Sequence, residues 1–177
     1  MRSNAGFSLI EVLVATCLVA GGISALAQLL VIAGHVNGRA RFITTAAFLA
    51  QHKVEQLRGL SFGFDSNGLP WTDTTTDTRV APEAPAGGTG LSSSPADALS
   101  TNVDGYCDFA DAAGRLLGLG SGTPASSGAA YIRRWSITPL PANPARSVVI
   151  QVVVLGVAPG FSGELTRLID IRTRRPF

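Results

Sequence analysis

The longest apolar stretch of the chain lies close to its N-terminus. No side chain is charged between Val12 and Gly34, about 23 residues, and leucine, isoleucine and valine fall on every side of a helix drawn through them. About 20 apolar residues span a bilayer, and a helix that is apolar all round is either deeply buried or in lipid. A chain of 177 residues has too little protein to surround such a helix, so this run is predicted to form a transmembrane helix.

A secretory signal peptide is the alternative for this segment. Signal peptides carry an apolar region of about 7–15 residues behind a basic start and end in small residues before a cleavage site. The apolar run here is longer, its basic start is the single Arg2, and it passes into a second helical pattern without a clear break. A retained anchor therefore fits the sequence better than a removed leader.

The second helical pattern covers residues 37–60. Apolar side chains recur there at spacings of three and four, and charged side chains, Lys53 among them, fall largely elsewhere, which is typical of an amphipathic helix with one buried face. The predicted buried positions are Ile43, Ala46 or Ala47, Ala50, Val54 and Leu57. The helix is expected to end at Gly59 or soon after, because glycine commonly stands at a helix end.

Residues 61–128 show no long periodic pattern. The segment is rich in Gly, Ser, Thr, Pro, Ala and Asp and holds few large apolar side chains. Such a composition indicates a variable loop region, with a short strand or helix expected around residues 106–119.

Three strand patterns lie within residues 129–177. They are rich in β-branched and aromatic residues, or alternate apolar and polar residues, and turn-forming residues separate them. The predicted strands are Ala130–Ile137, Arg146–Leu155 and Leu165–Arg172. The predicted fold is therefore α+β, with a long N-terminal helix packed on a small C-terminal antiparallel β-sheet. The helix face expected against the sheet is that of Ile43, Ala47, Val54 and Leu57.

Composition narrows the classes of function. Hydrophobic residues make up 46% of the chain, charged residues 15%, and the mean hydropathy is +0.29, which excludes an intrinsically disordered chain. The formal net charge of +2 is too small to predict a nucleic-acid partner.

Few residues are suited to metal binding or catalysis. Two cysteines, Cys17 in the apolar run and Cys107 in a polar loop, cannot make a disulfide scaffold, so Cys107 is expected to be a free thiol or an intermolecular bridge. Two histidines fall short of a metal cluster, and His35 and His52 are interpreted as an interfacial residue and a helix-surface residue. No Ser-His-Asp or Cys-His arrangement can be nominated.

Two segments of the loop region contain residue types that also occur in ligand sites. The spacing of Asp104, Asp108 and Asp111 fits no EF-hand, so solvated loop acids are favoured over Ca²⁺ ligands. The glycine-rich segment Gly118–Gly122 does not match a dinucleotide-binding loop. No metal and no cofactor are predicted.

Glu11 interrupts the apolar pattern at the front of the predicted membrane helix. A charged group in a lipid-facing helix costs about 2.5–3.5 kcal/mol, less near the interface, and is by default a functional candidate. The alternative is that Glu11 only favours the positive end of its own helix dipole and reaches the lipid headgroups. By position alone the two interpretations are equal.

The residues around Glu11 carry a resemblance to a known family. The segment Gly6–Ala15, read GFSLIEVLVA, resembles the N-terminal signal of type IV pilins and type II secretion pseudopilins, in which a short polar leader ends in glycine. The resemblance implies that a prepilin peptidase cuts between Gly6 and Phe7 and then methylates the new amino group of Phe7. It also implies that the Glu11 carboxylate serves assembly by meeting the N-terminal amine of a neighbouring subunit.

A second, looser resemblance lies in the amphipathic segment. Residues Leu49–Arg58 resemble the corresponding helix of PilV-like minor pilins and of the pseudopilin I of type II secretion. In the pilin plan, residues 1–6 form a cytoplasmic leader peptide and residues 7–36 the transmembrane half of the helix. Residues 37–60 form its amphipathic half.

The resulting hypothesis is a non-enzymatic, minor pilin-like structural subunit of a type IV pilus. Implied partners are other pilins or pseudopilins through the N-terminal helix, the prepilin peptidase and an inner-membrane assembly platform. The implied location is the bacterial inner membrane, single-pass, with a cytoplasmic N-terminus and a periplasmic C-terminal domain. This orientation comes from the resemblance, because Arg39 and Arg41 flank the far end of the apolar run and do not support it.

Three alternatives stay open. One is a pseudopilin of a type II secretion system. Another is a major pilin, although those usually carry a paired C-terminal disulfide loop that this chain lacks. The third, of a different class, is a membrane-anchored enzyme or sensor whose functional residues would lie in the loop region or the sheet.

Overall fold

The protein is described here by a computed structural model, which covers residues 6, 8–76, 88–117, 128–158 and 160–175. The chain divides into two compact units, Met1–Arg41 and Phe42–Phe177. The boundary between them falls inside the long N-terminal helix.

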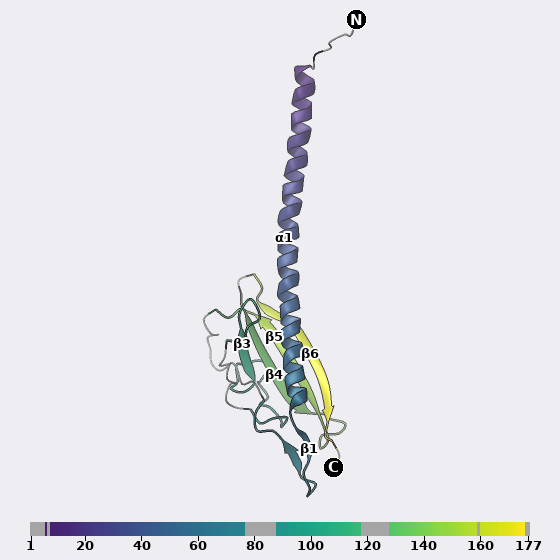
Figure 1. The fold of residues 1–177 in the computed structure, drawn as a ribbon, viewed down its shortest axis with the longest axis vertical. Coiled ribbons are helices and arrows are strands. Elements are labelled where there is room, and N and C mark those ends of the chain that lie inside the picture. Colours follow the sequence, from purple (N-terminus) through teal and green to yellow (C-terminus); the bar gives the residue numbers. More distant parts are fainter. Residues whose placement is uncertain (1–5, 7, 77–87, 118–127, 159, 176–177) are drawn as a thin grey trace. The chain divides into compact units, whose positions relative to one another are not determined.

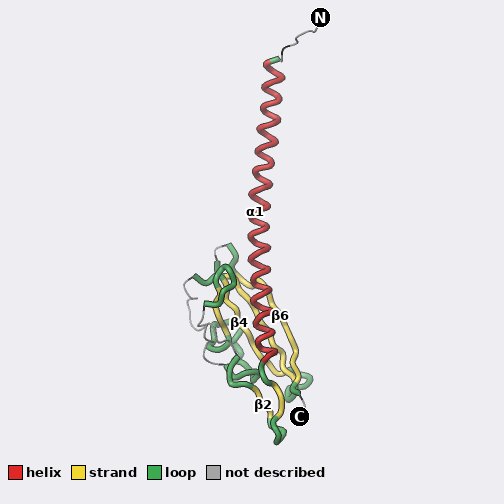
Figure 2. Tube along the Cα trace, viewed as in Figure 1, coloured by secondary structure: helices red, strands yellow, loops and turns green. Residues whose placement is uncertain are grey.

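Helix α1 runs from Leu9 to Gly59, a length of 51 residues (Figures 1 and 2). It begins after Ser8, whose carbonyl oxygen accepts hydrogen bonds from the backbone N–H groups of Glu11 and Val12 at 3.0 and 3.2 Å. It ends at Gly59, which confirms the predicted end. The two sequence patterns that predicted an apolar and an amphipathic helix thus form one continuous element.

The sheet of the C-terminal unit has four antiparallel strands in the order β3-β4-β5-β6 (Figure 1). The three predicted strands are confirmed as β4, β5 and β6, joined as a meander. The short strand β3 lies in the segment where a short element was expected. The strand bounds are Cys107–Ala110 for β3, Tyr131–Pro139 for β4, Ser147–Gly156 for β5 and Gly163–Thr173 for β6.

The interior position of β5 explains its sequence. This strand pairs with β4 on one side and β6 on the other, and Val152, Val153 and Val154 are all at most 2% exposed. A strand buried on both faces has a nearly continuous apolar sequence rather than an alternating one. The edge strand β6 does alternate, with Ile169 and Ile171 exposed between half-buried neighbours.

A small separate hairpin follows the helix. Strands β1 (Phe62–Phe64) and β2 (Pro70–Thr72) pair antiparallel, and Asp65 organises the turn between them. The Asp65 carboxylate accepts hydrogen bonds from the backbone N–H groups of Asn67 and Leu69 at 2.9 and 2.8 Å, as short acidic side chains do in turns.

The core forms where the C-terminal part of α1 packs on the sheet. The helix buries a stripe at spacings of three and four, and the sheet meets it with large side chains of β4 and β5. Buried helix residues are Ala46, Leu49, Ala50, Lys53, Val54 and Leu57, and buried sheet residues against them include Tyr131, Trp135, Ile137, Ile150 and Val152.

Three details of the predicted helix face were wrong. Ile43 is 40% exposed and Ala47 is exposed, whereas Ala46 and Leu49 are buried. Lys53, expected among the solvent-facing charges, is fully buried. Ala50, Val54 and Leu57 are buried as predicted, so the buried stripe overlaps the predicted one and extends further round the helix, to Leu49 and Lys53.

Candidate functional site

The predicted processing site lies at the start of the N-terminal unit. Gly6 is exposed and precedes the helix, and Phe7 lies outside the described residues. The cleavage between Gly6 and Phe7 and the methylation of Phe7 therefore stay predictions.

Glu11 lies in the first turn of α1 and is exposed. It shares one face of the helix with Ala15, Val19 and Ile23, which with their neighbours line a shallow, almost wholly apolar groove on the helix surface. Residues four apart lie above one another on a helix, so the carboxylate stands at the end of an apolar stripe. An exposed carboxylate in this position is available to a cation from outside its own helix.

Two local effects favour Glu11 where it is. A carboxylate in the first turn gains about 0.3–1 kcal/mol from the positive end of the helix dipole. Ser8 and Glu11 also stand at the spacing of a capping box, although the hydrogen bond between them joins backbone atoms, N–H of Glu11 to the carbonyl of Ser8. These effects stabilise the helix start and leave the carboxylate oxygens free to serve a second role.

The rest of the N-terminal unit exposes a continuous apolar surface. The large apolar side chains from Val12 to Val36 are between 51% and 75% exposed. Soluble monomers rarely expose an apolar patch beyond a few hundred Å². In the described part of the chain, α1 is the one helix long and apolar enough to cross a membrane.

The prediction made for Asp108 from the sequence is wrong. This residue was expected to be a solvated loop acid, but its side chain is fully buried in β3 and pairs with the fully buried Arg133 of β4. The guanidinium donates to both carboxylate oxygens, at 2.9 Å from Nε and 2.6 Å from a terminal nitrogen, and to the carbonyl of Leu49 in α1 at 2.8 Å. This pair links helix and sheet through the core.

The other two loop acids do not join it. Asp104 is exposed, and Asp111 is half-buried and accepts hydrogen bonds from the backbone N–H groups of Ala113 and Arg115 within its own turn, each at 2.9 Å. Among the described residues no three metal-ligating side chains gather at one place. The glycine-rich segment Gly118–Gly122 lies outside the described residues.

Lys53 is the third buried charged residue of the core, after Asp108 and Arg133. Its ammonium lies 3.7 Å from the centre of the Trp135 ring and donates to the carbonyl of Thr76 at 3.1 Å. A desolvated cation over an indole gains about 2 kcal/mol or more, which offsets part of the cost of burial. Lys53 thereby ties the loop after β2 to the helix.

The cysteines and histidines show no catalytic arrangement in the described residues. Cys17 is exposed and Cys107 is buried, and neither forms a disulfide. Burial, with the nearby Asp108 carboxylate, raises the pKa of the Cys107 thiol to about 12, so this thiol is neutral and inert near pH 7. His35 and His52 are both exposed, and the ring of His52 stacks on that of Phe48 with 6.3 Å between centres.

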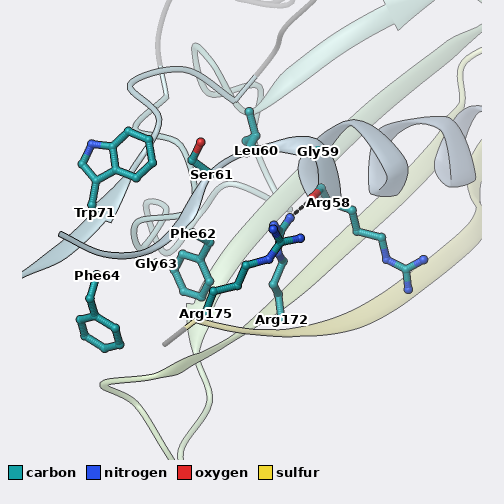
Figure 3. A pocket seen from close by; sticks show the side chains of 10 residues that line it. All are labelled: Arg58, Gly59, Leu60, Ser61, Phe62, Gly63, Phe64, Trp71, Arg172 and Arg175. Carbon is teal, nitrogen blue, oxygen red and sulfur yellow. Dashed lines mark hydrogen bonds between the residues drawn. The ribbon is translucent and has the colours of Figure 1, made fainter. Parts of the chain in front are cut away.

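A cleft of about 580 Å³ lies in the C-terminal unit where α1 ends (Figure 3). It is lined by arginines and aromatic residues together with the backbone that leads into β1. The lining residues are Arg58, Gly59, Leu60, Ser61, Phe62, Gly63, Phe64, Trp71, Arg172 and Arg175. Arg58 and Gly59 lie at the predicted end of the helix, but the sequence predicted no binding role for any residue of this cleft. The available signal was the dense run of arginines at positions 172, 174 and 175.

Two arginines of this cleft join the end of α1 to β6: Arg58 through an ion pair, and Arg172 through hydrogen bonds to the helix end. Arg58 holds the Asp170 carboxylate of β6 with two hydrogen bonds of 2.9 and 2.8 Å. These bonds lower the pKa of Asp170 below its ordinary value. Arg172 donates to the backbone carbonyls of Leu57 and Arg58, which are among the last of the helix and lack helical partners. The end of α1 is thus fastened to β6.

Comparison of the chain with protein-family models, with curated proteins and with solved structures gives no match. The architecture itself is pilin-like: a long apolar N-terminal helix continues into a half that packs on an antiparallel sheet.

Proposed function

We propose that this chain is a minor pilin-like structural subunit of a type IV pilus. The observation that carries the proposal is the segment Gly6–Ala15, which lies at the start of helix α1. The same helix has no charged side chain from Val12 to Gly34. Its pilin-like architecture supports the same conclusion.

In this proposal the prepilin peptidase removes residues 1–6 and methylates Phe7. The helix then sits in the inner membrane, with the C-terminal unit in the periplasm. The exposed apolar side chains from Val12 to Val36 pack on lipid before assembly and on the helices of other pilins afterwards.

Glu11 provides the specific contact of assembly. An ammonium and a carboxylate attract strongly in an apolar surrounding, whereas either one alone there is costly. The exposed carboxylate of Glu11 is the acid of an otherwise apolar stripe, so it suits the N-terminal amine of Phe7 on a neighbouring subunit. This pairing would set the axial register between subunits.

We assign the chain no catalytic role. Asp108, Arg133 and Lys53, which are its buried charged residues among those described, each serve the core through the contacts given above. The partners proposed are other pilins, the prepilin peptidase and the inner-membrane assembly platform.

The Glu11→Val variant tests the assembly role. It should be processed and inserted at least as well as the wild type, because a charge has left an apolar helix. Its recovery with partner pilins from membranes should fall sharply, because the incoming amine loses its counter-charge. Ser24→Val, a polar-to-valine change on the same helix at a residue that does not line the groove of Glu11, is the matched control and should assemble normally. Equal recovery of partners by Glu11→Val and wild type would refute the role.

Mass spectrometry of the mature N-terminus tests the family assignment itself. A chain that begins with N-methylated Phe7 supports it. An intact Met1, or a cut far from Gly6 in a host that contains a prepilin peptidase, would instead favour a membrane-anchored enzyme or sensor.

A further inference from the structure

We propose that the arginine-rich cleft at the end of α1 binds single-stranded nucleic acid, with Arg172 and Arg175 holding backbone phosphates and Trp71 stacking on a base. This proposal does not depend on the proposed function, because every residue it uses lies in the C-terminal unit.

One wall of the cleft carries an excess of positive charge. The side chains of Arg172 and Arg175 overlap in the view of Figure 3, and burial, followed by the charge of Arg175, lowers the pKa of Arg172. Among the residues that the structure describes, no carboxylate forms an ion pair with Arg172, Arg174 or Arg175. Like charges held together in this way favour an anion from outside.

Two carboxylates lie near enough to attract Arg172. Asp170 is ion-paired with Arg58, which balances its charge, and Asp73 accepts a hydrogen bond from the backbone N–H of Ser61 at 2.6 Å. Asp73 stays negatively charged in that contact, because a backbone N–H is neutral. The positive charge offered to a ligand therefore comes mainly from Arg175 and only in part from Arg172.

The same cleft has an exposed aromatic ring. Trp71 of β2 is 54% exposed, whereas Phe62 is only 4% exposed and already carries the guanidinium of Arg174 at 4.1 Å from its ring centre. An exposed indole in a cleft that also holds guanidinium groups offers a stacking face, and stacking of a base on an aromatic ring tolerates any sequence.

Hydrogen bonds within the protein hold the arginines of this site in position before a ligand binds. Arg172 is fixed by its hydrogen bonds to the helix-end carbonyls. Arg174 donates to the carbonyls of Gly63 and Trp71 at 3.0 and 3.2 Å, so it holds both strands of the hairpin that carries the indole. A site held in place before binding loses less conformational entropy when the ligand arrives.

The combination favours nucleic acid over an acidic peptide. Guanidinium groups suit both phosphate and carboxylate, but a peptide acid does not require an open stacking face beside it. A volume of about 580 Å³ accommodates a short stretch of a strand rather than a duplex. The formal net charge of +2 gives no sign of this site, since it arises in residues 1–41, and residues 42–177 hold 11 basic and 11 acidic side chains.

The test measures binding of the full chain, in detergent, to a fluorescent oligothymidylate of about 10 nucleotides. Arg175→Ala should weaken binding and reduce the dependence of log affinity on log salt by about 0.7, the value for one lost phosphate contact on a single strand. Trp71→Ala should weaken binding about 5- to 150-fold, whereas Trp71→Phe should keep most of it. The matched control, Arg167→Ala, removes an arginine of β6 that does not line the cleft, and should bind as the wild type does.

Circular dichroism of each variant checks that it is folded. Three outcomes would overturn the proposal: no saturable binding by the folded wild type, equal losses in Arg167→Ala and Arg175→Ala, or no effect of Trp71→Ala. Competition by poly-glutamate as effective as that by oligothymidylate would also overturn it, and would assign the cleft to acidic peptides instead. Because N-terminal processing and pilin recovery are measured separately, failure here leaves the pilin proposal intact.

Discussion

Replacing Asp108 by asparagine is expected to destabilise the C-terminal unit by about 3–5 kcal/mol, the cost of leaving a buried charge unpaired. Both side chains of the Asp108–Arg133 pair are 0% exposed, so water cannot replace the lost carboxylate. The change keeps the side-chain volume but turns an amide N–H towards the guanidinium. The two hydrogen bonds, at 2.9 and 2.6 Å, are charge-assisted and worth about 1.5–3 kcal/mol each, which gives the same order of magnitude.

The assay is urea unfolding of the full chain at constant detergent, followed by the fluorescence of the buried Trp135. With a slope of about 2 kcal/mol per molar urea, the midpoint should fall by about 2 M. The double variant Asp108→Leu with Arg133→Met should regain most of the loss, since apolar residues of similar volume often replace a buried ion pair without cost. A midpoint shift below about 0.5 M, or a double variant less stable than the single one, would refute the reasoning.

Two further changes probe the sheet and its contact with the helix. Gly156→Ala should destabilise the C-terminal unit by about 3 kcal/mol, because a Cβ there would lie 1.8 Å from the carbonyl oxygen of Phe161. The control is Gly59→Ala, whose added Cβ would meet nothing within 4 Å. Equal unfolding midpoints of the two variants in urea would contradict the predicted clash. The contribution of the Arg58–Asp170 pair should depend on pH. Because the folded pKa of Asp170 is depressed, its stabilisation is present above the ordinary aspartate pKa of about 3.9 and is lost as the pH falls through the folded pKa. Wild type should therefore exceed Asp170→Asn in stability at pH 7 and converge with it in acid, and an unchanged difference would contradict the pair's role.

The sequence was sufficient for the elements that local pattern controls. The uncharged run behind Glu11 and the glycine at position 59 predicted the extent of α1, and β-branched runs predicted β4, β5 and β6. These signals are strong because helix and strand periodicity act over neighbouring residues, independently of the rest of the chain. The roles of Gly6, Phe7 and Glu11 likewise come from the sequence alone, through resemblance to pilins, and remain predictions.

The tertiary structure decided which side chains meet. Ala46 and Ala47 are the same residue type, so only the packed sheet distinguishes the buried one from the exposed one. Lys53 and Asp108 were expected in water because charge alone predicts exposure, and their burial depends on Trp135 and Arg133, partners far away in the sequence. The arginine-rich cleft likewise depends on residues that are distant in the sequence and close in the fold.

Arg58 and Asp170 are 112 residues apart, and Arg172 reaches the end of α1 across a similar separation. Whether such charges pair or stand together without a counter-ion depends on strand register and helix position, which no local window of sequence contains. The sequence by itself therefore determined the helix, the strands and the N-terminal signal. Only the fold determined the buried charges and the arginine-rich cleft, because electrostatic interactions depend on distance in space rather than along the chain.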